Sequence, residues 1–358
     1  MMNLNDFANY IAHEVKGYLP PDYQEAKVEI NNIVKNNDIS LCGISIRRDE
    51  EQVVPLIYVD DLYDRYVMGE DPSILVEEVA SMRLEYDASN TMINKPGLIV
   101  NDMLDNYEIA KENLLISICN TERNQIQLLG KVRREIGEFS ETYRLCMNIR
   151  DAKDYMASVG ISYDMLDRWG VSPEQLHEDA IIAENKREPL LATLHDILRK
   201  SFVGTEPVNI LTEISPESMY DPDLVDDLYI LSTADTIVGA HMMLRDDILS
   251  KAGDFFENDF YVLPSSVHEV LLAPVSMGID VQELNVMVRS INGNPEVMKS
   301  IDILSDNVYS YNRDKHVLIN TKTGDNIDLR KDGKFVQNDP YIISENKSQS
   351  KPKKKHSR

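Results

Sequence analysis

The chain has 358 residues, of which 42% are hydrophobic and 27% charged, and its formal net charge is −24. It is long enough for about two domains with packed cores, so wholesale disorder is excluded, and no apolar run reaches the roughly 18 residues that a transmembrane helix needs. A chain this acidic is expected to repel nucleic acid and anionic membranes.

The cysteines and the first residues indicate the compartment. Cys42, Cys119 and Cys146 lie far apart and form no Cys-x-x-Cys pair, which argues against a disulfide framework and against a cysteine zinc site. The opening sequence MMNLNDFANYIAHEVKGYL lacks the basic start and the continuous apolar stretch of a secretory signal. We therefore expect a cytoplasmic protein.

Residues 1–95 are predicted to form a small α+β unit. The expected elements are a helix over 3–18, a β-hairpin of strands 26–34 and 39–46, a third strand over 53–59, a short helix over 60–67 and a helix over 73–84. Pro55 places the third strand at a sheet edge. Ser73 is expected to cap the last helix, because Glu77 and Glu78 lie in its first turns.

Residues 96–225 are predicted to be a mainly helical middle with one or two strands. The expected elements are a helix in the second half of 97–120, a strand over 141–149 that continues at 156–161, a helical turn over 162–169, a helix from 172 to about 186, a helix over 189–202 and an acidic loop over 207–222. The clearest boundary is Ser172-Pro173, an N-cap residue followed by proline at the first helical position.

Residues 226–344 are predicted to form a C-terminal α+β unit. The expected elements are a strand over 228–231, a helix with Ile237, His241, Leu244 and Ile248 on one face and a stop at Gly253, strands over 260–263 and 267–272, a helix over 280–293, and hairpins 308–311/317–319 and 327–329/335–336. Gly239 and Ala240 are small enough to let another backbone approach closely. Residues 345–358 are a polar, basic tail that we expect to be disordered.

Together these elements predict an α+β fold: a small N-terminal helix and β-hairpin unit, a helical middle, and a C-terminal mixed sheet backed by helices. The sheet is expected to be covered by helices on at least one face, since its strands are apolar on both sides.

One cluster of potential chemistry stands out at Ser265–Glu269. Ser266 and His268 point to the same side of an extended segment and Glu269 to the other. A hydroxyl beside an imidazole suggests a nucleophile and its base, with Glu269 or Asp235 as a third member. However, residues two apart on a strand do not normally hydrogen-bond, and no Gly-x-Ser-x-Gly elbow is present. The alternative is that the serines bond backbone groups after Pro264.

The other chemical motifs favour structural interpretations. The His-Glu pairs at 13–14, 177–178 and 268–269 lack the second histidine of a zinc protease motif, and there is neither a P-loop nor a Gly-x-Gly-x-x-Gly. We therefore expect no metal and no cofactor. His195 and His241 are expected in the core. Four aspartates lack calcium-loop spacing and are expected to form a solvated face; they are Asp221, Asp223, Asp226 and Asp227. Lys353–Lys355 are expected to belong to a solvated tail.

Two stretches resemble a known family. YILSTADTIVGAHMML and FYVLPSSVHEVLLAP are similar to the C-terminal half of an uncharacterised family of bacterial proteins from Gram-positive gut anaerobes, which carries a YILPSSxHEV-like motif. The segment with Pro55, Ile57, Tyr58, Asp60 and Asp61 resembles its first half. The resemblance covers most of residues 3–315. It implies no activity, because the family has none assigned.

Three functions stay open. The first is a non-enzymatic interaction or regulatory protein whose partner has a basic surface; the last thirteen residues hold six Lys or Arg and no acid, so the rest of the chain carries −30. The second is a hydrolase or transferase that uses Ser266 and His268. The third is an acidic defence or anti-defence protein that mimics DNA with rows of carboxylates.

Overall fold

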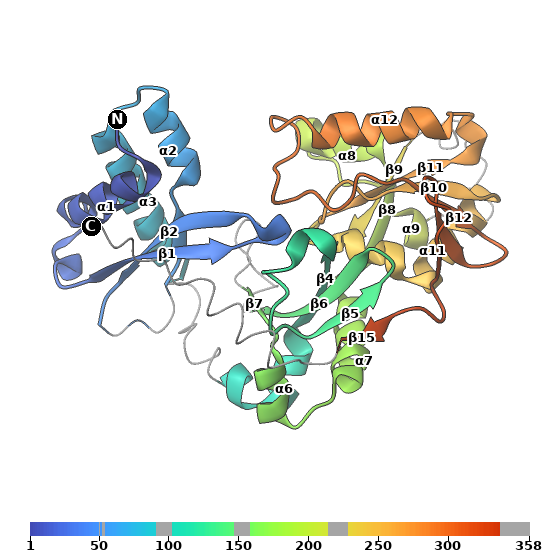
Figure 1. Cartoon of the computed structure of the whole chain (residues 1–358), viewed down its shortest axis with the longest axis horizontal. Helices are drawn as coiled ribbons and strands as arrows, with labels where there is room; N and C mark the ends of the chain where they lie inside the picture. The colour runs from blue at the N-terminus through green and yellow to red at the C-terminus, as the bar shows by residue number, and fades with distance from the viewer. Residues whose placement is uncertain (50, 52–53, 91–101, 147–157, 214–227, 337–358) are drawn as a thin grey trace, which may run out of the picture. The chain divides into compact units, whose positions relative to one another are not determined.

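The computed structural model describes residues 1–49, 51, 54–90, 102–146, 158–213 and 228–336 (Figure 1). The chain divides into two compact units, Met1–Asn106 and Tyr107–Arg358. The expected basic tail and the aspartates at 221–227 lie outside the described residues. In the part of the chain that is described, no helix has the length and apolarity needed to cross a membrane.

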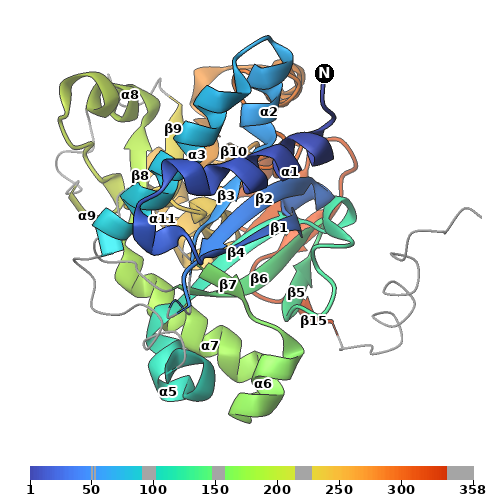
Figure 2. The ribbon, with the colours of Figure 1, turned by 90° about the vertical axis from the view of Figure 1, so that its left-hand side faces the viewer.

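The first unit is a three-stranded antiparallel sheet covered by helices. Its elements are α1 (Leu4–Glu14), β1 (Lys27–Val34), β2 (Ser40–Arg47), β3 (Leu56–Tyr58), α2 (Asp60–Val67) and α3 (Pro72–Asn90). The strand order is β1-β2-β3, so β3 lies at an edge, as Pro55 predicts. Figure 2 shows α1 across this sheet; Phe7 and Ile11 of α1 and Val76 of α3 share a core with Ile44 and Ile46 of β2.

The residue that caps α3 lies two positions before the predicted one. The helix begins at Pro72, and the Asp71 side chain accepts a hydrogen bond from the Ser73 backbone N–H at 2.8 Å. Asp71 therefore takes the capping role that was expected of Ser73, because proline is well suited to the first helical position behind an acidic cap.

The second unit contains two antiparallel sheets. The seven-stranded sheet has the order β14-β13-β12-β10-β11-β9-β8, and the other has β15-β5-β6-β4 with β7 paired to β6. The strands are β4 (Leu114–Asn120), β5 (Arg133–Ile136), β6 (Phe139–Cys146), β7 (Ser158–Gly160), β8 (Pro189–Thr193), β9 (Tyr229–Thr233), β10 (Phe260–Leu263), β11 (Val270–Pro274), β12 (Tyr309–Asn312), β13 (Val317–Asn320), β14 (Asn326–Asp328) and β15 (Lys334–Phe335). The strand β8 comes from the expected middle segment yet pairs with β9, so one sheet takes strands from both sides of residue 225.

Helices cover both faces of the seven-stranded sheet. The helices of the second unit are α5 (Tyr107–Ala110), α6 (Tyr163–Trp169), α7 (Pro173–Glu184), α8 (Leu194–Val203), α9 (Ile210–Glu213), α11 (Asp246–Phe256) and α12 (Val281–Asn292), with the 3₁₀ segment η7 (Gly239–Leu244). Of these, α7 packs against β4 of the other sheet, and α8 and α9 lie against β8 of the seven-stranded sheet. Phe260 and Leu272 face a core shared with Leu249 of α11. Leu263 packs in a second core with Leu284 of α12.

The α+β class is confirmed, with the N-terminal helix and hairpin and a C-terminal sheet backed by helices. All the described pairings of that sheet are antiparallel, where a mixed sheet was expected. The helix caps are also as predicted for α7, since the Ser172 hydroxyl accepts from the Gln175 N–H at 3.2 Å and Pro173 is the first helical residue.

Several predicted elements are wrong in the second unit. Residues 114–120 form β4 and residues 189–193 form β8, where helices were expected. Both are short apolar runs whose pairing partners lie far along the chain, and such runs fit either element by pattern alone. The segments 326–328 and 334–335 do not pair with each other: β14 pairs with β13 and β15 with β5. The strand β11 runs to Pro274 rather than ending at 272.

A buried arginine joins the helices of the first unit to its sheet. The Arg83 side chain of α3 is 0% exposed; its Nε donates to the Ile46 carbonyl at 3.0 Å and its Nη2 to Glu51 at 2.5 Å. Its Nη1 donates to Asp87, which also accepts from the Tyr23 hydroxyl. Since a buried cation needs all its partners, this cluster fixes α3 against β2.

We expect Arg83→Met to destabilise the first unit by about 3 kcal/mol, because the change removes the buried cation of Glu51 and Asp87 and leaves both carboxylates with Arg48 as their ion-pair partner. Arg65→Met is the control: Arg65 pairs with Glu70 and Glu78, and its side chain is 39% exposed. The loss of these solvent-screened pairs should change the stability much less than Arg83→Met does. Hydrogen exchange of the β1 and β2 amides in increasing urea measures both values. Equal losses in the two variants would contradict the role given to Arg83.

Candidate functional site

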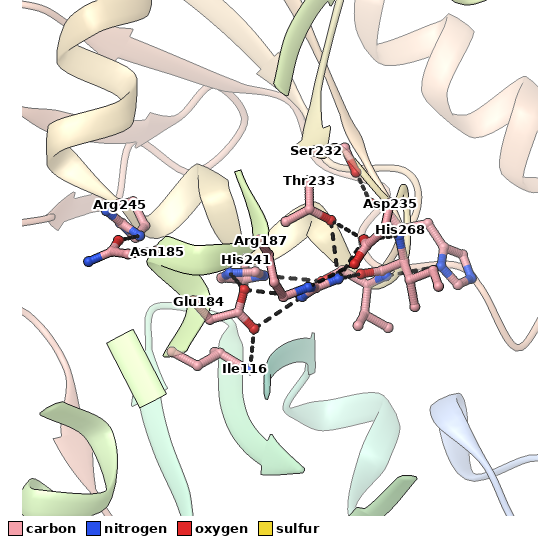
Figure 3. A network of polar contacts seen from close by, with 12 residues as sticks. Ile116, Glu184, Asn185, Arg187, Ser232, Thr233, Asp235, His241, Arg245 and His268 are labelled. Carbon is pink, nitrogen blue, oxygen red and sulfur yellow. Dashed lines mark hydrogen bonds and ion pairs between the residues drawn. The ribbon is translucent and has the colours of Figure 1, made fainter. Parts of the chain in front are cut away.

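Buried charges converge on Arg187, which follows α7 and is 8% exposed (Figure 3). Its Nη1 donates to both carboxylate oxygens of Glu184 at 3.1 Å. Its Nε and Nη2 donate to Asp235 at 3.0 and 2.6 Å, and Nη2 also reaches the Ile237 carbonyl at 2.6 Å and the Thr233 hydroxyl at 3.2 Å. One guanidinium thus ties the end of α7 to the turn between β9 and η7.

Glu184 is the innermost member of this network, at 0% exposure. It accepts from the Ile116 N–H of β4 at 2.8 Å, and its Oε2 lies 3.3 Å from His241 Nε2. Burial by itself raises the pKa of the Glu184 carboxyl, but the nearby His241, the Arg187 charge and the Ile116 amide outweigh burial and hold that pKa below its usual value. Glu184 is therefore a carboxylate at neutral pH.

The turn that Arg187 holds has a strained backbone. Thr236 and Val238 are β-branched residues with φ of 54° and 45°, in the left-handed region that such residues avoid. Asp235 supports the turn from within, since it accepts from the Ile237 N–H at 3.0 Å and from the Thr233 hydroxyl at 2.7 Å. These bonds replace the continuous helix that was predicted over 237–248: η7 covers 239–244, and α11 begins at Asp246 and runs past Gly253.

Gly239 sits where the turn meets the next strand connection. Its N–H donates to the His268 carbonyl at 2.8 Å. A Cβ added there would lie 2.3 Å from Ser232 Oγ, 2.6 Å from Thr233 N and 3.0 Å from His268 O. The expected close approach of another backbone at this glycine is confirmed, and no larger residue fits without moving that backbone.

The three predicted site residues build a local turn beside this network. The Ser266 hydroxyl accepts from the His268 N–H at 3.0 Å. The His268 imidazole instead meets other segments: Nδ1 accepts from the Val238 N–H at 3.3 Å, and Nε2 lies 3.4 Å from Asp302 Oδ1. The Ser266 hydroxyl and the His268 imidazole therefore bond other groups and not each other. The Ser266 hydroxyl bonds a backbone N–H, which is the alternative that the sequence left open.

The charges around His268 shift two pKa values in the same direction. The Asp302 hydrogen bond raises the pKa of His268, assisted by the charges of Asp302 and Glu269 and opposed by burial. Burial raises the pKa of Glu269, opposed by His268 and Ser266. Asp235, expected as a third member of a catalytic set, bonds Arg187 and its own turn, and the Arg187 contacts outweigh burial to lower the pKa of Asp235.

The two histidines expected in the core behave differently. His241 is buried at 1% exposure, as expected, and its Nδ1 lies 3.1 Å from the Val238 carbonyl. His195 is exposed in the first turn of α8, so its prediction is wrong. Because residues 189–193 form β8, the apolar residue Leu191 does not share a helix face with His195. Among the described residues, no group of three or more His, Cys, Asp or Glu side chains is placed to hold a metal ion.

Sequence reasoning missed Glu184 and Arg187, although a signal was present. Leu176, Ala180 and Ala183 form the buried face of α7. Glu184 and Arg187 continue that face at helical spacing, so a pair of opposite charges lies on an apolar stripe. Burial of one charge without the other would be strongly unfavourable, so the two residues of such a pair are expected to be buried together.

A cavity of about 400 Å³ lies against His241. Its polar lining comes from β5, β6, α7, η7 and the start of α11, and the rest of the lining is mainly aliphatic. Its polar lining residues are Arg134, Glu141, His177, Asn185, His241, Arg245 and Asp247.

Comparison with known proteins gives one match. The model of a family of unknown function, DUF5688, matches residues 4–313, which span both units. No curated protein and no solved structure matches the chain.

Gly239→Ala should destabilise the second unit by more than about 2 kcal/mol, because the added methyl group meets backbone at 2.6 Å. Gly253→Ala is the control. Gly253 is buried inside α11, and the atoms nearest its added Cβ belong to the Arg313 side chain, at 3.3 Å and beyond. The control should be neutral or up to about 1 kcal/mol more stable, since alanine favours helix. Urea unfolding followed by Trp169 fluorescence measures both; a neutral Gly239→Ala would refute the close approach.

Glu184→Gln should destabilise the second unit by about 3–5 kcal/mol at neutral pH, because Arg187 loses a buried counter-charge. The folded-state pKa of Glu184 is lowered, so its contribution is present above the unfolded pKa of about 4.3 and disappears as pH falls through the folded value. The difference in unfolding free energy between wild type and variant should therefore become smaller below about pH 4. Glu178→Gln, exposed on the same helix, should change neither stability nor its pH dependence; a pH-independent gap for Glu184→Gln would contradict the assignment.

Proposed function

Because the chain belongs to DUF5688, a family of unknown function, we propose its role from its own geometry: a non-enzymatic interaction or regulatory protein of the cytoplasm. One observation carries this proposal. The Ser266 hydroxyl is bonded to the His268 N–H, while the His268 imidazole is bonded to the Val238 N–H and to Asp302. A nucleophile and its base would instead face each other within hydrogen-bond reach.

The distribution of charge supports a partner with a basic surface. Residues 1–106 hold 20 acidic and 8 basic side chains, a net −12, so half of the chain's −24 lies in the smaller unit. Clustered charge of one sign speeds encounter with an oppositely charged partner. We further expect family members to come from Gram-positive gut anaerobes and to share the motif that is Tyr261–Val270 in this chain.

The corner where α2 meets α3 is the surface that we assign to the partner. Asp64, Asp71 and Glu77 are exposed there. Met68 and Ile74 lie among them and are 86% and 53% exposed. Apolar side chains within an acidic rim are a composition typical of a protein interface, and they suit a basic partner with an apolar centre better than DNA mimicry, which needs rows of carboxylates.

A capture experiment with charge reversals tests this role. Asp64→Lys with Glu77→Lys should weaken capture of a partner from native lysate at least about tenfold, since the change reverses the field at the α2–α3 corner. Glu174→Lys with Glu178→Lys makes the same change on exposed acids of α7 and should leave capture intact. Added salt should weaken the wild-type complex.

Two results would overturn the proposal. Equal loss of partners from both double variants would show that the capture reflects general acidity. Loss of the cellular phenotype in Ser266→Ala or His268→Ala, with the fold and the captured partner retained, would favour the hydrolase or transferase alternative.

A further inference from the structure

The His268 imidazole lies between the strained turn and a carboxylate, at the edge of the Arg187 network (Figure 3). Its Nδ1 accepts from the Val238 N–H at 3.3 Å, and its Nε2 lies 3.4 Å from Asp302 Oδ1. Both distances are longer than the roughly 3.0 Å of an ordinary N–H hydrogen bond, so neither partner holds the ring closely. The side chain is 38% exposed, and protons from solvent therefore reach it.

The two partners of the imidazole favour opposite protonation states. The Val238 N–H needs a lone pair on Nδ1, and only the neutral ring supplies one, because the imidazolium carries a hydrogen on both nitrogens. The Asp302 carboxylate favours the imidazolium, since a hydrogen bond between opposite charges is stronger than one from a neutral donor. Protonation of His268 therefore removes the acceptor of Val238 and strengthens the contact with Asp302.

The charged groups around the ring place this protonation near neutral pH. The hydrogen bond to Asp302 raises the pKa of His268 above its ordinary value of 6.5, assisted by the charges of Asp302 and Glu269 and opposed by burial. On the side of the turn, Asp235 and Arg187 pair with each other at 2.6 Å. The imidazole therefore becomes charged as the pH falls through its raised pKa.

The peptide that loses its acceptor is held from two sides. The Val238 N–H belongs to the peptide between Ile237 and Val238, and the carbonyl of this peptide accepts from Arg187 Nη2 at 2.6 Å. Val238 has a φ of 45°, a conformation that a β-branched residue keeps only where its surroundings impose it. Without the His268 acceptor, this peptide is held through its carbonyl, and the constraint on Val238 is weaker.

We propose that His268 is a pH-sensitive switch for the turn over residues 235–239. The neutral imidazole holds the Val238 N–H, and the imidazolium releases it and binds Asp302 more strongly. The change is confined to the turn, because the Gly239 N–H and the Ser232 hydroxyl donate to the His268 carbonyl at 2.8 Å, and these bonds do not involve the imidazole. The switch is independent of the proposed partner surface, since it lies in the second unit and uses none of the residues of the α2–α3 corner.

A pH titration of the full chain by NMR tests the switch. Labelling with carbonyl-13C isoleucine and 15N valine selects the amide of Val238, which follows an isoleucine, and that of Val34 in β1, which also does. The Val238 resonance should shift with the same midpoint as the His268 imidazole, and its amide should lose about two- to tenfold of its protection from hydrogen exchange on protonation. Val34 should not respond. A Val238 amide that stays unchanged while His268 titrates overturns the proposal.

Two variants assign the transition to His268. His268→Asn offers an amide oxygen that can accept from the Val238 N–H but does not titrate, so the transition should disappear. Asp302→Asn removes the charge that favours the imidazolium, so the midpoints of His268 and Val238 should both fall, by the same amount. His241 also contacts Val238, through the carbonyl at 3.1 Å. A Val238 transition that persists in His268→Asn, or keeps its midpoint in Asp302→Asn, arises from another group and contradicts the proposal.

Discussion

The guanidinium of Arg187 is the point on which the second unit depends, because it holds two carboxylates and a strained turn at once. A buried arginine is tolerated only when its donors are used, and here Glu184, Asp235, Thr233 and the Ile237 carbonyl use them. The turn in return places Val238 and Gly239 against the His268 segment. Loss of the Arg187 network would leave the strained turn without its hydrogen bonds, and loss of the turn would leave Arg187 without part of its acceptors. The network and the turn therefore depend on each other.

The fold was predictable where a local signal decides it. Ser172 and Pro173 mark the start of α7 as N-cap and first helical residue, and the turn residues between β1 and β2 predict their hairpin. The signal fails for β4 and β8, since their apolar runs become strands only by pairing with β6 and β9. The helical spacing from Ile237 to Ile248 is misleading for another reason: Arg187, about 50 positions away, holds Ile237 in a turn.

The candidate site shows the same limit. Ser266, His268 and Glu269 do lie together, as their adjacency requires, but the use of each side chain is decided by groups remote in sequence, the Val238 amide and Asp302. Glu184 and Arg187 escape notice because charged residues near a helix end are usually solvated. Only their alignment with the buried face of α7 distinguishes them. The net negative charge, in contrast, can be counted from the sequence alone. The structure adds that half of this charge lies in the first unit.

The tautomer of His268 is the most direct test of the claim that these residues build a turn rather than a catalytic pair. The turn requires Nδ1 to accept the Val238 N–H, which leaves the proton on Nε2, toward Asp302. Nitrogen-15 NMR of the imidazole, at a pH above its raised pKa, reports the protonated nitrogen. The Nε2–H form is the result that this account predicts. An Nδ1–H form would contradict it, because Val238 would then lack its acceptor and the imidazole would be available to Ser266.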